Sequence, residues 1–175
     1  KFRGVDPLLS PEMKSTGEVM GIAADFPAAF AKAQLGAGCC LPLSGRVFVS
    51  VREVDKPAAI ILSGMLADAG FEVVATSGTH HALSQAGVQS TPVAKVTDGS
   101  RPHIVDRLLS GEVALIVNTT EGAQAITDSK SIRQAALDQA IPYFTTIAGG
   151  LAAAEAIVRH ADMTEVKTIQ AYHGG

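Results

Sequence analysis

Short apolar runs alternate with helical patterns from residue 46 onward, and this alternation leaves few folds open to the chain. The runs cover 46–51 (RVFVSV), 71–76 (FEVVAT), 90–96 (STPVAKV), 113–120 (VALIVNTT) and 141–146 (IPYFTT). Runs that are apolar on both faces and separated by helices are typical of parallel strands buried between two helical layers. The sequence therefore predicts an α/β fold, a three-layer, doubly wound and mostly parallel five-stranded sheet.

Local signals mark several element ends within this pattern. Asp55 is expected to cap a helix over 56–70, and a further helix is expected over 80–87 after the turn at 76–79. Pro92 cannot donate a ladder hydrogen bond, so its strand is expected at an edge of the sheet.

The first 45 residues lack this alternation. One helix is expected over 26–36, with Asp25 as its N-cap. We predict three parts: a tail of another domain over 1–36, a Gly-, Pro- and Ser-containing linker over 37–45, and the α/β domain over 46–175. Because the chain starts at Lys1, we expect a fragment whose residues 1–36 have lost their hydrophobic partners. That segment is expected to be partly ordered at best, or to dock on a neighbouring copy.

Composition excludes two classes of partner. The chain is 47% hydrophobic and 18% charged, has a net charge of −3, and contains no stripe of Lys and Arg of the kind that binds nucleic acid. No apolar stretch approaches the roughly 18 residues needed to span a bilayer. We expect a cytoplasmic protein that binds neither nucleic acid nor membrane.

Polar residues follow the predicted strands, at the edge where open parallel sheets bind ligands. These are Arg52, Lys56, Thr76, Ser77, Gly78, Thr79, Lys95, Asn118, Thr119, Thr120 and Thr145. Hydroxyls, helix amides and lysines suit a phosphate, and Asn118 and Thr120 suit a sugar or base. A helix N-terminus stabilises an anion by at most about 2 kcal/mol, whereas micromolar binding needs about 8 kcal/mol. Lys56, Lys95 and residues 118–120 must therefore act with the turn at 76–79; the alternative is a set of helix caps and solvated lysines.

Metal and nucleophile signatures do not stand out. His80 and His81 are neighbours on a predicted helix, so their side chains point about 100° apart and do not grip one ion. The sequence has no HExxH, CxxC, G-x-S-x-G or Walker motif. We predict no metal site and no catalytic residue.

Several motifs resemble the large chain of carbamoyl-phosphate synthase. The start of the sequence resembles the end of that family's second ATP-grasp half, and motifs from residue 50 on match, in order, the allosteric domain that closes the family's chain. The motifs are KFRGVDPLLSPEMKSTGEVMGIA, SVREVDK, ATSGTHHAL, AKVTDGSRPHIVDRLLSGEV, IVNTTEG, DSKSIRQAAL and PYFTT. The allosteric domain is similar in fold to methylglyoxal synthase and to the IMP cyclohydrolase domain.

The resemblance implies a regulatory role without catalysis in this fragment. The family makes carbamoyl phosphate from glutamine, bicarbonate and ATP for pyrimidine and arginine synthesis, and its bacterial members bind UMP as inhibitor and IMP as activator at one site. The whole enzyme is expected to use ATP with Mg and K ions, to pair with a glutaminase small chain and to form a homo-oligomer. The fragment itself is expected to hold no cofactor.

The resemblance also assigns residues to the effector site. The motif positions for the nucleotide phosphate are Lys56, Thr76, Gly78, Thr79 and Lys95, and those for ribose and base are Ser50, Asn118 and Thr120. Ornithine, an activator of the enteric enzymes, contacts a Tyr-Asp-Thr stretch that aligns with 143–145. Tyr143 and Thr145 match, but Phe144 replaces the carboxylate that would pair with the ornithine ammonium, which puts ornithine activation in doubt.

Two other functions stay open at this point. A lyase of the methylglyoxal synthase type would act on a triose phosphate and needs a general-base aspartate, for which only Asp98 and Asp106 are available in the matching stretch. A purely structural role would make the domain a holder of the large chain's oligomer.

Overall fold

A five-stranded parallel sheet forms the centre of the protein. The computed structural model describes residues 18–95, 101–121, 125, 127, 129–159 and 167–173. The strands are β1 (Arg46–Ser50), β2 (Glu72–Thr76), β3 (Thr91–Val93), β4 (Leu115–Asn118) and β5 (Tyr143–Phe144), in the order β3-β2-β1-β4-β5 with every pair parallel. The predicted α/β fold is confirmed, and the strand that contains Pro92 lies at an edge as expected.

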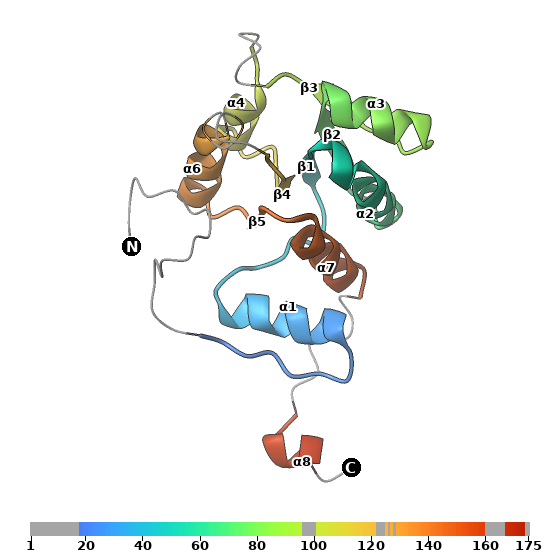
Figure 1. Ribbon diagram of the computed structural model, residues 1–175. Helices are drawn as coiled ribbons and strands as arrows, with labels where there is room; N and C mark the ends of the chain where they lie inside the picture. The colour runs from blue at the N-terminus through green and yellow to red at the C-terminus, as the bar shows by residue number, and fades with distance from the viewer. Residues whose placement is uncertain are drawn as a thin grey trace.

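Helices cover both faces of this sheet (Figure 1). The described helices are α1 (Phe26–Gly36), α2 (Lys56–Asp68), α3 (Ser77–Gln85), α4 (Ile104–Leu109), α6 (Lys130–Asp138), α7 (Ile147–Val158) and α8 (Ile169–His173), with a 3-10 turn η1 at Glu53–Asp55. Helices α2, α3 and α7 pack on one face, and α4 and α6 pack on the other. No helix in the described residues is long and apolar enough to cross a membrane.

The side chains of β1 explain why the strand is apolar throughout. Val47 and Val49 point into the core beneath α2, α3 and α7, whereas Phe48 points into the core beneath α4 and α6. All three side chains are fully buried. A strand enclosed on both faces needs apolar residues at consecutive positions, as the sequence has them.

The helix after β2 begins earlier than predicted. Helix α3 begins at Ser77, and Thr76 is its N-cap, so the stretch expected as a turn is the first helical turn. Serine, glycine and threonine are weak helix formers, which makes a turn the better local prediction. Burial of Thr79 and Leu83 against the sheet favours the helix instead.

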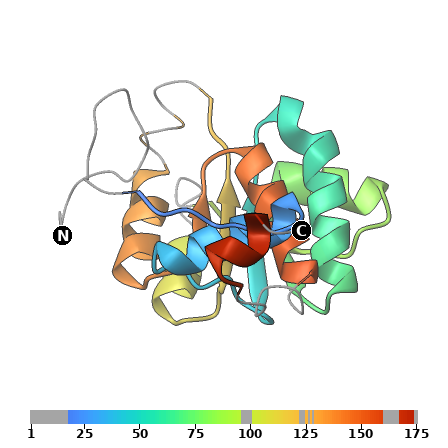
Figure 2. The ribbon, with the colours of Figure 1, turned by 90° about the horizontal axis from the view of Figure 1, so that it is seen from below.

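The N-terminal helix packs on the α/β domain of the same chain. Asp25 accepts a hydrogen bond from the amide of Ala28, as expected for an N-cap, and also pairs with Arg159 at 3.1 Å. The rings of Phe30 and Phe144 lie 6.3 Å apart, so α1 contacts the end of β5 as well as α7. Within the described residues from 18 on, the expectation that segment 1–36 lacks partners is therefore wrong (Figure 2). Its residues 1–17 lie outside the described residues, and the predicted boundary at residue 36 stays a prediction.

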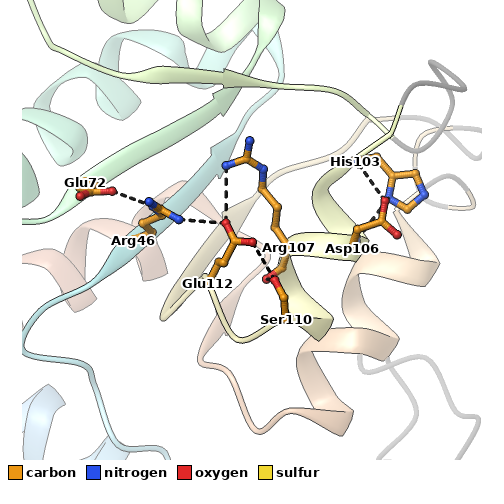
Figure 3. A network of polar contacts seen from close by, with 7 residues as sticks. All are labelled: Arg46, Glu72, His103, Asp106, Arg107, Ser110 and Glu112. Carbon is orange, nitrogen blue, oxygen red and sulfur yellow. Dashed lines mark hydrogen bonds and ion pairs between the residues drawn. The ribbon is translucent and has the colours of Figure 1, made fainter.

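Ion pairs join strand and helix ends at the amino edge of the sheet (Figure 3). The Arg46 Nε lies 2.6 Å from Glu72 Oε2, and its Nη1 lies 2.9 Å from Glu112 Oε2. Arg46 therefore links the starts of β1 and β2 to the segment that leads into β4. These groups are partly exposed, so each pair stabilises the fold only modestly.

Glycine at position 150 allows α7 to approach the sheet. A Cβ on Gly150 would lie 2.8 Å from Val117 Cγ1 and 2.9 Å from Leu62 Cδ1, whereas a Cβ on Gly64 in α2 would meet no heavy atom within 4 Å. We expect Gly150→Ala to lower the free energy of unfolding by about 1–3 kcal/mol through overpacking. The matched control Gly64→Ala is expected to raise it by about 0.5–1 kcal/mol. Urea unfolding tests both, and an equal stabilisation by the two variants would contradict the packing described.

Candidate functional site

A cavity of about 250 Å³ opens at the carboxyl edge of the sheet. It lies between the ends of β1 and β4, where the strand order reverses, which is the usual ligand position in such sheets. Its lining consists of Ser50, Val51, Arg52, Thr76, Lys95, Ile104, Asn118, Thr119, Thr120, Glu121, Ala125, Ser129 and Ile132. Its volume is slightly smaller than the lower limit of about 300 Å³ that is usual for small-molecule sites.

The lining brings together five of the eight residues that the family resemblance assigns to the effector site. These are Ser50, Thr76, Lys95, Asn118 and Thr120. They come from the ends of four different strands or the residues directly after them. The fold therefore gathers most of the predicted effector residues around one cavity.

Thr79 has a different environment from the one predicted. Its side chain is 2% exposed, and its Oγ1 accepts hydrogen bonds from the Val51 amide at 3.2 Å and from Thr76 Oγ1 at 3.5 Å. Thr76 Oγ1 also lies 3.1 Å from Ser50 Oγ. Thr79 thus joins the end of β1 to the start of α3 and lies behind the hydroxyls of Ser50 and Thr76.

The first turn of α3 has no side-chain cap. The N-cap Thr76 makes no side-chain hydrogen bond to the helix amides. A Cβ on Gly78 would meet no heavy atom within 4 Å, and Gly78 has no positive φ. Neither the neighbouring atoms of the described residues nor the backbone angle therefore requires glycine at this position, and Gly78 does not line the cavity.

The two predicted lysines lie in different settings. Lys95 lines the cavity just after β3, and the preceding Ala94 accepts a hydrogen bond from the Ile104 amide, which joins this end to α4. Lys56 does not line the cavity, and its ammonium pairs with Glu53 at 2.6 Å. Lys95 is the predicted cation that the structure brings to the cavity.

The end of β4 is linked to β5 by a side-chain hydrogen bond. Asn118 Nδ2 donates to the Tyr143 hydroxyl at 2.9 Å, which leaves the Asn118 Oδ1 as an acceptor beside the cavity. Tyr143 is half-buried and is not part of the lining, and neither is the half-buried Thr145. The two residues predicted to face ornithine therefore do not line the cavity, although Tyr143 contacts a residue that does.

Arg52 was not predicted as a site residue, yet it lines the cavity. Its Nε donates to Asp55 Oδ2 at 2.7 Å, and its backbone amide donates to Thr119 Oγ1 at 3.1 Å. Asp55 occupies the N-cap position of α2 but makes no capping hydrogen bond, so its expected role as a cap is wrong. The sequence signal for Arg52 was its place directly after β1, three residues before a carboxylate.

The buried Asp55 carboxyl depends on these neighbours. It is 7% exposed. The hydrogen bond from Arg52 lowers its pKa most, desolvation opposes this by raising the pKa, and a hydrogen bond from Thr119 lowers it further. Arg52 and Thr119 thus keep Asp55 ionised, and together the three residues tie the end of β4 to the segment before α2.

The candidate bases for a lyase lie elsewhere. The Asp106 carboxylate accepts from the His103 amide at 2.9 Å and pairs with Arg101 at 3.0 Å in the capping box of α4, and it does not line the cavity. Asp98 lies outside the described residues. Among the described residues, no group of three His, Cys, Asp or Glu side chains is placed to hold a metal ion.

Replacing Asp55 tests this arrangement through its pH dependence. The lowered folded-state pKa means that the carboxylate stabilises the fold above the unfolded-state pKa of about 3.9, and that this contribution is lost as the pH falls through the folded-state pKa. We expect Asp55→Asn to lower the free energy of unfolding by about 1–2 kcal/mol at pH 7, with the difference shrinking toward pH 3. The exposed Asp68→Asn serves as control, with a change within about 0.5 kcal/mol. Urea unfolding at pH 7 and pH 3 measures both variants. A loss of unfolding free energy in Asp55→Asn that is the same at both pH values would contradict the role given to the ionised carboxylate.

Known proteins agree with this architecture and with the motifs. A family model described as "MGS-like domain" matches residues 59–145. The chain is 55% identical over 175 residues to the carbamoyl phosphate synthase large chain of Pseudomonas aeruginosa, covering 100% of this chain and 16% of the relative. It is 50% identical to that of Myxococcus xanthus, covering 99% of this chain and 16% of the relative, and 50% identical to that of Rhizobium meliloti, covering 98% and 15%.

The chain thus spans about a sixth of the length of the curated relatives that it matches. The similarity runs over nearly the whole chain, so it includes the segment before the MGS-like match. The resemblance drawn from the sequence motifs is confirmed. The chain belongs to the carbamoyl phosphate synthase large-chain family and represents the segment of it that contains an MGS-like domain.

Proposed function

We propose that this chain is the nucleotide-sensing regulatory part of a glutamine-dependent carbamoyl phosphate synthase, with UMP as inhibitor and IMP as activator. The observation that carries the proposal is the cavity at the carboxyl edge of the sheet, where Lys95 and four polar side chains from three other strands converge. Convergence of this kind is expected of a ligand site and is not needed for helix capping alone.

The phosphate end of the ligand is proposed to lie between Lys95 and the first turn of α3. Lys95 supplies a charge, Thr76 supplies a hydroxyl, and the amides near Gly78 supply donors with the favourable end of the helix dipole. Thr79 supports this end by fixing the start of α3, through its bond to the Val51 amide. Lys56 is proposed as a further phosphate contact, which requires its pair with the exposed Glu53 to open.

The ribose and base are proposed to lie toward β4. Asn118 offers a carbonyl acceptor because its amide nitrogen is held by Tyr143, and Ser50 and Thr120 offer hydroxyls. In this arrangement Tyr143 orients a ligand-binding side chain. Tyr143 and Thr145 stay proposals as ornithine-side contacts, and the aromatic contact of Phe144 with Phe30 gives that position a packing role in place of a charge.

The reaction itself is proposed for the whole large chain. Synthesis of carbamoyl phosphate from glutamine, bicarbonate and ATP, with Mg and K ions, would take place in domains that this chain does not span, with the glutaminase small chain as partner. The proposed role of this chain is to shift that activity when a nucleotide binds, and couplings of this type are typically about 1–3 kcal/mol. Assembly of the whole protein as a homo-oligomer and its cytoplasmic location stay predictions.

Calorimetric titration of UMP and of IMP into the 175-residue chain tests this proposal. We expect micromolar binding of both, with competition for one site, and a loss of about 10-fold or more in affinity in Lys95→Ala, because a hydrogen bond to a charged group contributes about 1.5–3 kcal/mol. The matched control is Arg159→Ala, which removes one positive charge at the carboxyl end of α7, where Arg159 pairs with Asp25.

Two results would contradict the proposal. Folded protein that binds neither nucleotide would leave the cavity without the proposed ligand. Equal binding by Lys95→Ala and by the unaltered chain would place the phosphate away from Lys95. Release of methylglyoxal from dihydroxyacetone phosphate by the purified chain would favour the lyase instead.

A further inference from the structure

Arg52 is a second cation in the lining of the cavity, and it is not among the residues assigned to the effector site from the sequence. It follows β1, the central strand, while Lys95 follows the edge strand β3. The two cations therefore reach the cavity from different strands. Lys56, which was predicted instead, is held by Glu53 outside the lining.

The contacts of Arg52 fix one side of its guanidinium and leave the other side available. Its Nε donates to the buried Asp55 carboxylate at 2.7 Å. Within the part of the chain that the structure describes, its two terminal nitrogens have no hydrogen-bond partner. A guanidinium has five donors in a fixed planar fork, so one edge can hold a carboxylate while the other binds a second anion.

The backbone of Arg52 is fixed as well. Its amide donates to Thr119 Oγ1 at 3.1 Å, and the Thr119 amide in turn donates to the Ser50 carbonyl at 3.0 Å. Asp55 is buried and needs its partner, so Arg52 has little freedom to leave the rim of the cavity. The side chain is preorganised before any ligand arrives, which lowers the cost of binding.

We infer that Arg52 binds the anionic group of the nucleotide through its terminal nitrogens, with Asp55 as the residue that positions it. This inference rests on the proposed function, because it assigns a residue to the same cavity. Glu121 also lines the cavity and interacts electrostatically with Arg52. Its carboxylate repels an anion bound there, so the two residues have opposite effects on affinity.

The test is calorimetric titration of UMP into the unaltered 175-residue chain and into its variants Arg52→Gln, Arg52→Lys and Glu121→Gln. We expect Arg52→Gln to weaken UMP binding by about 10- to 100-fold, and Arg52→Lys to weaken it less because the charge remains without the fork. Glu121→Gln is expected to strengthen binding about two- to threefold, as suits an exposed charge. A loosened fold does not produce tighter binding, so this variant keeps the test valid if Arg52→Gln is unstable.

Arg46→Gln is the matched charge control, because Arg46 starts the same strand at the opposite edge of the sheet and also holds carboxylates (Figure 3). It is expected to leave UMP affinity unchanged. Uridine, which lacks the phosphate, shows whether Arg52 contacts the phosphate or only maintains the shape of the cavity. In an NMR titration at millimolar uridine, Arg52→Gln should leave the affinity for uridine unchanged.

The outcomes separate the inference from the proposed function. UMP binding by the unaltered chain that Arg52→Gln does not weaken would overturn the role of Arg52 and leave the nucleotide site in place. Equal weakening of UMP and uridine would overturn it too, because Arg52 would then act through the shape of the cavity. Absence of UMP binding by the folded, unaltered chain would overturn both.

Discussion

Parallel pairing of β1 with β2 and β4 is the constraint on which the rest of the structure depends. Its register places Val49 beside Ala75 on one side and Ser50 beside Asn118 on the other. Parallel strands end at the same edge of the sheet, so this pairing alone brings together the polar residues that follow the strands. The apolar side chains of β1, buried on both faces, hold that register, because a slip of one residue would exchange the two faces.

The carboxyl edge is further stabilised by polar groups that are largely buried. A hydrogen bond to Thr79 joins the end of β1 to α3. Hydrogen bonds of Arg52 to Asp55 and to Thr119 join the segment after β1 to the end of β4. Buried polar groups of this kind are costly unless every partner is present. Their presence beside the cavity indicates a rim that keeps its shape, and the proposed nucleotide sensor would need such a preformed site.

The strands were predicted well from the sequence, because strands buried on two faces are apolar at consecutive positions. The edge position of β3 was also predicted, because Pro92 cannot donate a ladder hydrogen bond. The start of α3 was predicted three residues late, because Ser77, Gly78 and Thr79 favour a turn locally and only contact with the sheet makes them helical. The packing of α1 on α7 was missed for the same reason: the contact of Phe30 with Phe144 joins residues far apart in the chain.

The strand ends predict which residues line the cavity where position in the strand alone decides it, and they do not where a side chain has a choice of partner. Asn118 and Thr120 follow directly from the end of a strand, whereas Ser50 was expected inside a strand and was assigned to the site only by the family resemblance. Lys56 and Arg52 lie in one short segment. The local sequence does not show that Lys56 pairs with Glu53, or that Arg52 pairs with Asp55 and lines the cavity. That choice depends on the burial of Asp55 and on its hydrogen bond from Thr119, which directly follows another strand, β4.

The measurement that tests the central claim most directly is an NMR titration of the ¹⁵N-labelled chain, first with uridine and then with UMP. If the phosphate lies between Lys95 and the start of α3, the amides of Gly78 and Thr79 will shift with UMP and not with uridine, while Asn118 responds to both. Shifts that are identical for the two ligands, or that fall on the amino edge around Arg46, would contradict the account.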